Sequence, residues 1–197
     1  MITQDAFTSG KSLIGTILDK MVGISERQKV FFIEVTMLFL TIKGKINFTQ
    51  MGRFSSSPEV RFCNMFKKVF DFLSFNSLFI TEQCGDELIV GFDPSYLSKS
   101  GKHTPNLSYF YCGETGMIKR GKEFGCLDIM DFKQNRANHI VAVETPPVKK
   151  GDAETGLINH HCKIFTQRIS TNKKHSKILI IDSWFNRQKF VKHLTLL

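Results

Sequence analysis

ELIVGFDPSY, residues 87–96, and KILIIDSWF, residues 177–185, contain the two apolar runs that decide the fold. We expect strands over Glu87–Asp93 and Lys177–Asp182, because short apolar runs of this length are typical of buried strands. Each run ends in an aspartate, Asp93 in the first and Asp182 in the second. A carboxylate at the tip of a buried strand is costly unless it is paired, hydrogen-bonded or bound to a cation.

The rest of the second half contains more strand candidates around a turn-rich, basic segment, residues 113–122. They are followed by a polar loop, a helix and the second acidic strand. The strand candidates are Leu107–Cys112, Phe124–Met130 and His139–Glu144, and the helix candidates are Gly156–Ser170 and Phe185–Leu197. This order predicts an α/β (α+β) fold with an incomplete mixed sheet.

The first half is predicted to be helical. Lys29–Lys43 is apolar on nearly every face, which suits a helix buried among others, and Phe48–Phe54 is a short amphipathic segment. A longer helix is expected over Glu59–Phe75, with a serine cap and Pro58 at its first position. We therefore expect a helical region over residues 1–85 and a catalytic region over residues 86–197.

The charge of the chain favours a polyanionic partner. The 197 residues carry a formal net charge of +9, and both halves are basic. Phosphate neutralisation supplies most non-specific affinity for DNA, although a basic surface without a partner is an equally good interpretation of charge alone. The segments Phe48–Phe54 and Glu59–Phe75, joined by a tight turn, resemble a helix-turn-helix corner. The basic side chains that we expect to contact DNA are Arg53, Arg61, Lys67, Lys68, Lys99, Lys102, Lys119 and Arg120.

Cysteine use and hydropathy indicate the compartment. Five scattered cysteines form no CxxC pair, which favours reduced thiols and a cytoplasmic, nucleoid-associated protein. The longest apolar run, Val30–Ile42, is interrupted by Glu34 and falls short of the roughly 20 residues that a membrane span needs. No secretory signal is visible at the start of the chain.

The two aspartates suggest a metal site. If their strands are neighbours, the carboxylates lie side by side and repel, a conflict that Mg²⁺ or Mn²⁺ would relieve. The alternative interpretation is that each aspartate only caps the turn that follows its strand.

Several ordered blocks of the sequence resemble transposases of insertion sequences of the DDE type, which have a ribonuclease-H-like catalytic core. Residues 91–131, which begin GFDPSYLSKSGKH, resemble the first catalytic block of that family. NRANHIVAVETPP, residues 135–147, resembles the following strand, and IIDSWFNRQKFV, residues 180–191, resembles the second block. GKINFTQMGRFSSSPEVRFCNMF, residues 44–66, is similar to the helical region ahead of the core.

The resemblance implies the roles of the acids and the partners. Asp93 and Asp182 would be the first two metal-binding aspartates of the catalytic triad, acting with Mg²⁺ or Mn²⁺ on double-stranded DNA of transposon ends and targets. The third member, a glutamate, would lie downstream of Leu197, so we expect a truncated transposase with little or no activity alone. The helical region would contribute DNA contacts and a homodimer interface.

Two other functions remain open. One is a non-catalytic, DNA-binding regulatory remnant of a transposase. The other is a metal-dependent nuclease that completes its site with Glu144 or Asp128. We expect Asp128 and Asp131 to face solvent, and His160, His161 and Cys162 to be surface or half-buried helix residues rather than metal ligands.

Overall fold

The computed structural model describes residues 4–147, 153–182, 185 and 190–192. The fold is α+β, with helices and one mixed sheet of five strands. Internal contacts divide the chain between Phe79 and Ile80 into two compact units, which are described separately. The helices are α1 (Gln4–Lys20), α2 (Glu26–Thr41), α3 (Phe48–Arg53), α4 (Glu59–Met65), α5 (Phe72–Gln83) and α6 (Ala153–His175). The strands are β1 (Leu88–Ser98), β2 (Ser108–Cys112), β3 (Met117–Asp131), β4 (Arg136–Glu144) and β5 (Leu179–Ile181).

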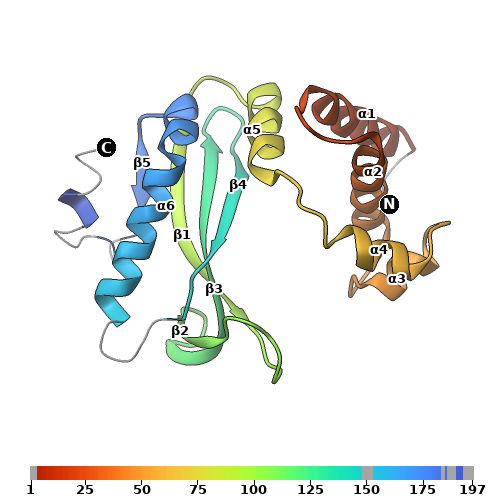
Figure 1. Cartoon of the computed structure of the whole chain (residues 1–197). Helices are drawn as coiled ribbons and strands as arrows, with labels where there is room; N and C mark the ends of the chain where they lie inside the picture. The colour runs from red at the N-terminus through yellow and green to blue at the C-terminus, as the bar shows by residue number, and fades with distance from the viewer. Residues whose placement is uncertain (1–3, 148–152, 183–184, 186–189, 193–197) are drawn as a thin grey trace. The chain divides into compact units, whose positions relative to one another are not determined.

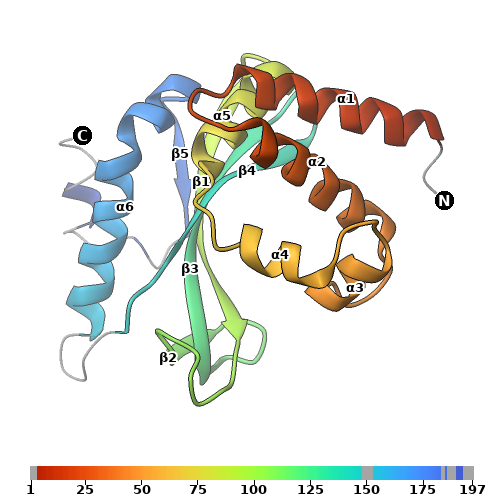
Figure 2. The same cartoon turned by 45° about the vertical axis from the view of Figure 1, so that its right-hand side comes forward.

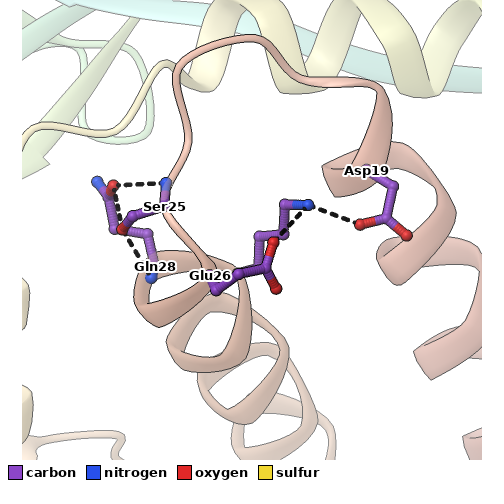
Figure 3. Close-up of polar contacts among 5 residues, drawn as sticks. Asp19, Ser25, Glu26 and Gln28 are labelled. Atoms are coloured by element: carbon purple, nitrogen blue, oxygen red, sulfur yellow. Dashed lines mark hydrogen bonds and ion pairs between the residues drawn. The ribbon is translucent and has the colours of Figure 1, made fainter.

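Helix α2 organises the N-terminal unit, and its start is fixed by local hydrogen bonds. The Ser25 hydroxyl accepts from the Gln28 backbone N–H, and the Gln28 side chain accepts from the Ser25 backbone N–H, which forms a capping box. Lys29 donates to Asp19 at the end of α1 and also pairs with Glu26 (Figure 3). These contacts join α1 to α2 around the turn between them.

The burial of α2 differs from the sequence prediction. Phe31, Val35 and Leu38 are buried in a cluster with side chains of α3 and α4, but Phe39 and Leu40 are exposed. Phe32 and Ile33 pack against a second cluster, which contains Ile17, Leu18 and Phe75. The helix is therefore covered on two sides, and the expectation of burial on nearly every face fails at exposed positions such as Phe39 and Leu40.

The single helix expected over Glu59–Phe75 is also wrong, because residues 66–71 separate α4 from α5. Tertiary contacts explain the break. The Phe70 ring stacks on Phe32 with centroids 4.4 Å apart, and the Gln28 amide donates to the Val69 carbonyl at 3.0 Å. Asp71 then accepts from the Ser74 backbone N–H near the start of α5. At the start of α4, Pro58 is the cap residue and no side chain caps the helix.

The sheet of the second unit is built around β3. Strand β1 pairs antiparallel with β3 over its whole length, while β4 and β2 pair with successive segments of β3. Strand β5 lies parallel to β1, with Val90 to Phe92 opposite Leu179 to Ile181. Figures 1 and 2 show β2 at the end of β3 remote from the β3–β4 turn. The segment expected to be a turn over residues 113–122 is a turn only at its start, since β3 begins at Met117.

One face of this sheet packs against α6. Val90 and Phe92 of β1 lie on this face with their cross-strand partners Ile129 and Leu127, and all four are buried. The Phe92 ring contacts the Phe165 ring of α6, and the two ring centroids are 4.8 Å apart. Both Figure 1 and Figure 2 show α6 running beside β1 and β5. The helix expected over Phe185–Leu197 lies largely outside the described residues.

Candidate acidic site at the end of the parallel strand pair

The two aspartates named from the sequence lie at neighbouring positions of adjacent parallel strands. Phe92 is opposite Ile181, so Asp93 and Asp182 follow side by side. Asp182 comes directly after the last residue of β5, as the sequence predicted. Asp93 does not end its strand, because β1 continues to Ser98 in register with β3. The prediction that β1 stops at Asp93 was therefore wrong, although the two acids do meet.

Pro94 explains why the parallel pairing stops at the acids. The Val90 N–H donates to the Ile178 carbonyl, so this side of β1 faces β5. Backbone N–H groups alternate in direction along a strand, so the nitrogens of Phe92 and Pro94 also face that side. Proline has no N–H to donate, and the ladder cannot extend past residue 92 on that side. Asp93 and Asp182 therefore lie just past the last paired residues of β1 and β5, where Pro94 prevents the pairing of these two strands from continuing.

The electrostatics of the pair are those of crowded carboxylates. Asp93 is exposed, but partial desolvation raises its pKa, and the nearby carboxylates of Asp182 and Asp128 raise it further. Asp93 and Asp128 share a sheet face, because Asp93 is opposite Cys126 and Asp128 is two residues further along β3. Asp128 is also 2.9 Å from His139 Nδ1. Negative charge is therefore concentrated on this part of β1 and β3.

These side chains fit a hard cation as two ligands. Carboxylate oxygens are the donors that Mg²⁺ and Mn²⁺ prefer, and a cation between Asp93 and Asp182 would relieve their repulsion. Over residues 4–147, 153–182, 185 and 190–192, no three His, Cys, Asp or Glu side chains group closely enough to hold a metal ion. Among the described residues, the candidate site therefore consists of the two carboxylates only.

The carboxylates considered as a third ligand have other partners. Glu144 pairs with Lys122 at 2.6 Å, and this hydrogen bond, together with one from Asn106, lowers the pKa of Glu144. Asp128 contacts His139, as described above. Asp131 is only 1% exposed and accepts from the backbone N–H groups of Gly85 and Gln134. The expectation that Asp131 faces solvent was therefore wrong, and its role is to hold the two turns that flank β1 and β3.

A cavity of about 730 Å³ lies at the same end of the sheet. Asp93 and Asp182 line it together with Glu123 of β3 and His161 of α6. Glu123 is buried, and its side chain accepts from the Thr145 hydroxyl at 3.0 Å. Burial raises the pKa of Glu123, the Thr145 hydrogen bond opposes that shift, and Asp93 adds to it.

Sequence reasoning missed Glu123 and misplaced His161. Glu123 is in phase with Gly125, Leu127 and Ile129, the apolar side of β3, and a charged residue in that phase was the available signal. His161 was expected at the surface or half-buried, but its side chain is fully buried, 3.9 Å from Glu123. Burial lowers the pKa of His161 to about 4. Cys162 is buried as well.

The basic residues expected to contact DNA fall into two groups. Arg61 is not available, because it pairs with Glu34, contacts Ser57 Oγ at 2.6 Å and lies over the Phe31 ring. Exposed side chains in the N-terminal unit are Arg53, Lys67 and Lys68. In the second unit, Lys99, Lys102 and Arg120 are exposed and Lys119 is half-buried.

The expected helix-turn-helix corner corresponds to α3 and α4, which lie next to each other in sequence and share the buried cluster of α2.

No helix of the described residues is long and apolar enough to cross a bilayer. Neither a family model nor a curated protein sequence matches the chain.

Proposed function

We propose that this chain is part of a DNA transposase of the DDE type, in which Asp93 and Asp182 are metal-binding acids. The observation that carries the proposal is the side-by-side position of these acids on neighbouring parallel strands. The partner is double-stranded DNA of transposon ends and targets, and the protein acts at the nucleoid in the cytoplasm as a homodimer.

The order of the strands supports the proposal. Three antiparallel strands, β1, β3 and β4, are followed by α6 and then by β5, which lies parallel to β1. This connectivity agrees with a ribonuclease-H-like core, in which the first strand and the strand after the helix place acids together. The small hairpin formed by β2 and the start of β3 is an addition to that order.

The residues of the chain divide the work of phosphodiester chemistry between them. Asp93 and Asp182 would hold Mg²⁺ or Mn²⁺, whose chemistry in such sites is activation of an attacking oxygen and stabilisation of the leaving one. Lys99, Lys102, Lys119 and Arg120 would bind DNA phosphates. The third carboxylate of the family has no match in this sequence, so we expect the chain alone to show little or no cleavage.

Cation binding tests the acid pair directly. We expect Mg²⁺ or Mn²⁺ to raise the melting temperature of the wild-type chain, and calorimetry to detect the ion. Asp93→Asn and Asp182→Asn should each abolish the effect, because each removes one of the two ligands. Glu114→Gln, at an exposed turn, is the matched control. An unchanged metal response in both Asp variants would refute the site.

The absence of a third ligand among the described residues favours a second candidate, a non-catalytic DNA-binding regulator. Under this alternative the chain binds transposon-end duplex, with affinity that falls as salt increases, but takes up no cation at Asp93 and Asp182. A binding assay with and without Mg²⁺, using wild type and Asp93→Asn, separates the two functions. Sedimentation of the wild-type chain tests the homodimer.

A further inference from the structure

The cavity beside the acid pair contains a buried carboxylate that the proposed function does not use. Glu123 lines this cavity and is only 7% exposed. It is in phase with Leu127 along β3, so it lies on the sheet face that α6 covers. We propose that the cavity binds a primary alkylamine, whose ammonium group pairs with Glu123 while its carbon chain lies against apolar walls. This inference is independent of the proposed function.

Among the described residues, no protein cation pairs with this carboxylate. The Thr145 hydroxyl donates to Glu123 Oε1 at 3.0 Å, and no other side chain in that part of the chain hydrogen-bonds the carboxylate. His161 Nε2 is 3.9 Å from Oε1, too far for a hydrogen bond, and burial lowers the pKa of His161 to about 4, so its imidazole is neutral at pH 7. Lys119 shares the sheet face but does not line the cavity. Because a buried charge is costly unless it is paired, Glu123 favours a cation that a ligand supplies.

Apolar side chains line the cavity beside Glu123. The registers of β1 and β2 with β3 place Pro94 and Phe110 on the same sheet face as Glu123. Leu157 of α6 and Phe185 also line the cavity, and the rings of Phe110 and Phe185 are almost fully buried. A carbon chain placed against these side chains would be removed from water, and aromatic ring faces also attract a cation.

The chemistry of the cavity favours an organic cation over a metal ion or an anion. Within the described ranges, no three His, Cys, Asp or Glu side chains group closely enough to hold a metal ion. A bound Mg²⁺ usually keeps several waters, which apolar walls cannot hydrogen-bond. Asp93 and Asp182 also line the cavity and would repel an anion. The volume of about 730 Å³ lies within the range of roughly 300–1,000 Å³ that is typical of small-molecule sites.

The test compares three probes by calorimetry in buffer without divalent cations. Pentylamine has both features of the proposed ligand, 1-pentanol has the chain without the charge, and ammonium chloride has the charge without the chain. We expect the wild-type chain to bind pentylamine about tenfold more tightly than either of the others, because a charge-assisted hydrogen bond and burial of the chain act together. Pentylamine should also raise the melting temperature by an amount that grows with its concentration.

Glu123→Gln should bind pentylamine no more tightly than 1-pentanol, because the amide keeps the size of the side chain and removes its charge. Without ligand this variant should be at least as stable as the wild type, since an amide costs less to bury than an unpaired carboxylate. Circular dichroism confirms that it is folded. Glu87→Gln is the matched control, because the Glu87 side chain is 66% exposed and does not line the cavity. It should keep the wild-type preference.

Asp93→Asn separates this site from the acid pair. It should weaken pentylamine binding less than Glu123→Gln does, because Asp93 is exposed. Equal affinity of the wild type for pentylamine and 1-pentanol, no binding of pentylamine, or an unchanged preference in Glu123→Gln overturns the inference. Loss of the preference in Asp93→Asn alone also overturns it, because the acid pair would then hold the ammonium group. None of these results decides the proposed function, which the response to Mg²⁺ or Mn²⁺ tests.

Discussion

Arg61 illustrates how a basic side chain near a predicted DNA-binding corner can be structural instead. Its guanidinium joins α4 to Glu34 of α2 and lies 5.6 Å from the centre of the Phe31 ring. Arg61→Ala removes these contacts and leaves Glu34, whose side chain is 20% exposed, without this partner. We expect a loss of about 2 kcal/mol in the free energy of unfolding, measured by urea denaturation.

Lys67→Ala serves as the control for Arg61, because Lys67 is exposed in the segment after α4. Its effect on stability should stay within about 0.5 kcal/mol. If the two variants were equally stable, the interpretation of Arg61 as a link between α2 and α4 would be wrong.

His161 should make the stability of the protein depend on pH. Its folded pKa of about 4 lies below the ordinary value of 6.5, so the unfolded chain binds the proton more tightly. The stabilising effect of this neutral, buried imidazole is full above pH 6.5 and is lost as the pH falls towards 4. The loss is at most about 3 kcal/mol.

The measurement is the slope of unfolding free energy against pH for wild type and His161→Phe. Glu123 acts in the opposite direction, since its raised pKa means that protonation of the folded state adds stability as the pH falls. The difference between the two proteins isolates His161, whatever the absolute stability of the variant. Identical slopes between pH 4 and 6.5 would contradict the burial of a neutral imidazole.

At the scale of elements, Gly125 determines how closely α6 packs on the sheet. An added Cβ would be 2.9 Å from the Phe92 ring and 3.0 Å from Ile164 Cδ1 of α6. Gly125→Ala therefore forces the ring and the helix apart, and we expect it to cost about 1–3 kcal/mol. Thermal unfolding monitored by circular dichroism measures the change.

Gly113→Ala is the comparison for this variant, since nothing lies within 4 Å of its added methyl group. It should melt within a degree or so of the wild type. Equal melting temperatures for both alanine variants would show that α6 yields without cost.

The element boundaries show where sequence reasoning succeeds and where it fails. Period and composition predicted β2 and β5 closely, because apolar runs with polar flanks define short strands. They did not predict the break at residues 66–71, since the Phe32–Phe70 stack that competes with helix formation joins distant parts of the chain. They also shortened β1 at Asp93, because a polar residue within a strand is indistinguishable from one at its end.

The candidate site was predicted only in part, because local patterns reveal some of its residues and contacts between distant parts of the chain decide the others. Asp93 and Asp182 stand out because each follows an apolar run. Glu123 and His161 depend on which elements pack on which face of the sheet, and that information resides in the register of β3 and in the position of α6 rather than in any local pattern.

At the scale of the whole molecule, the net charge of +9 should control DNA binding under the proposed function. The logarithm of the affinity is expected to fall linearly with the logarithm of the salt concentration. Lys99→Gln and Lys102→Gln should each reduce that slope by about one, since each removes one phosphate contact. A gel-shift titration at several salt concentrations measures the slope. An unchanged slope in both variants would show that the loop between β1 and β2 does not contact DNA phosphates.

Strand β3 is the common partner of β1, β2 and β4. A one-residue shift along a strand moves every side chain to the opposite face. Insertion or deletion of a single residue near the middle of β3 would therefore move the side chains on one side of the change to the opposite face relative to β1, and would also shift the register with β2 or with β4. This strand should tolerate amino-acid replacements far better than changes in length, whereas the Lys99–Leu107 loop should accept both.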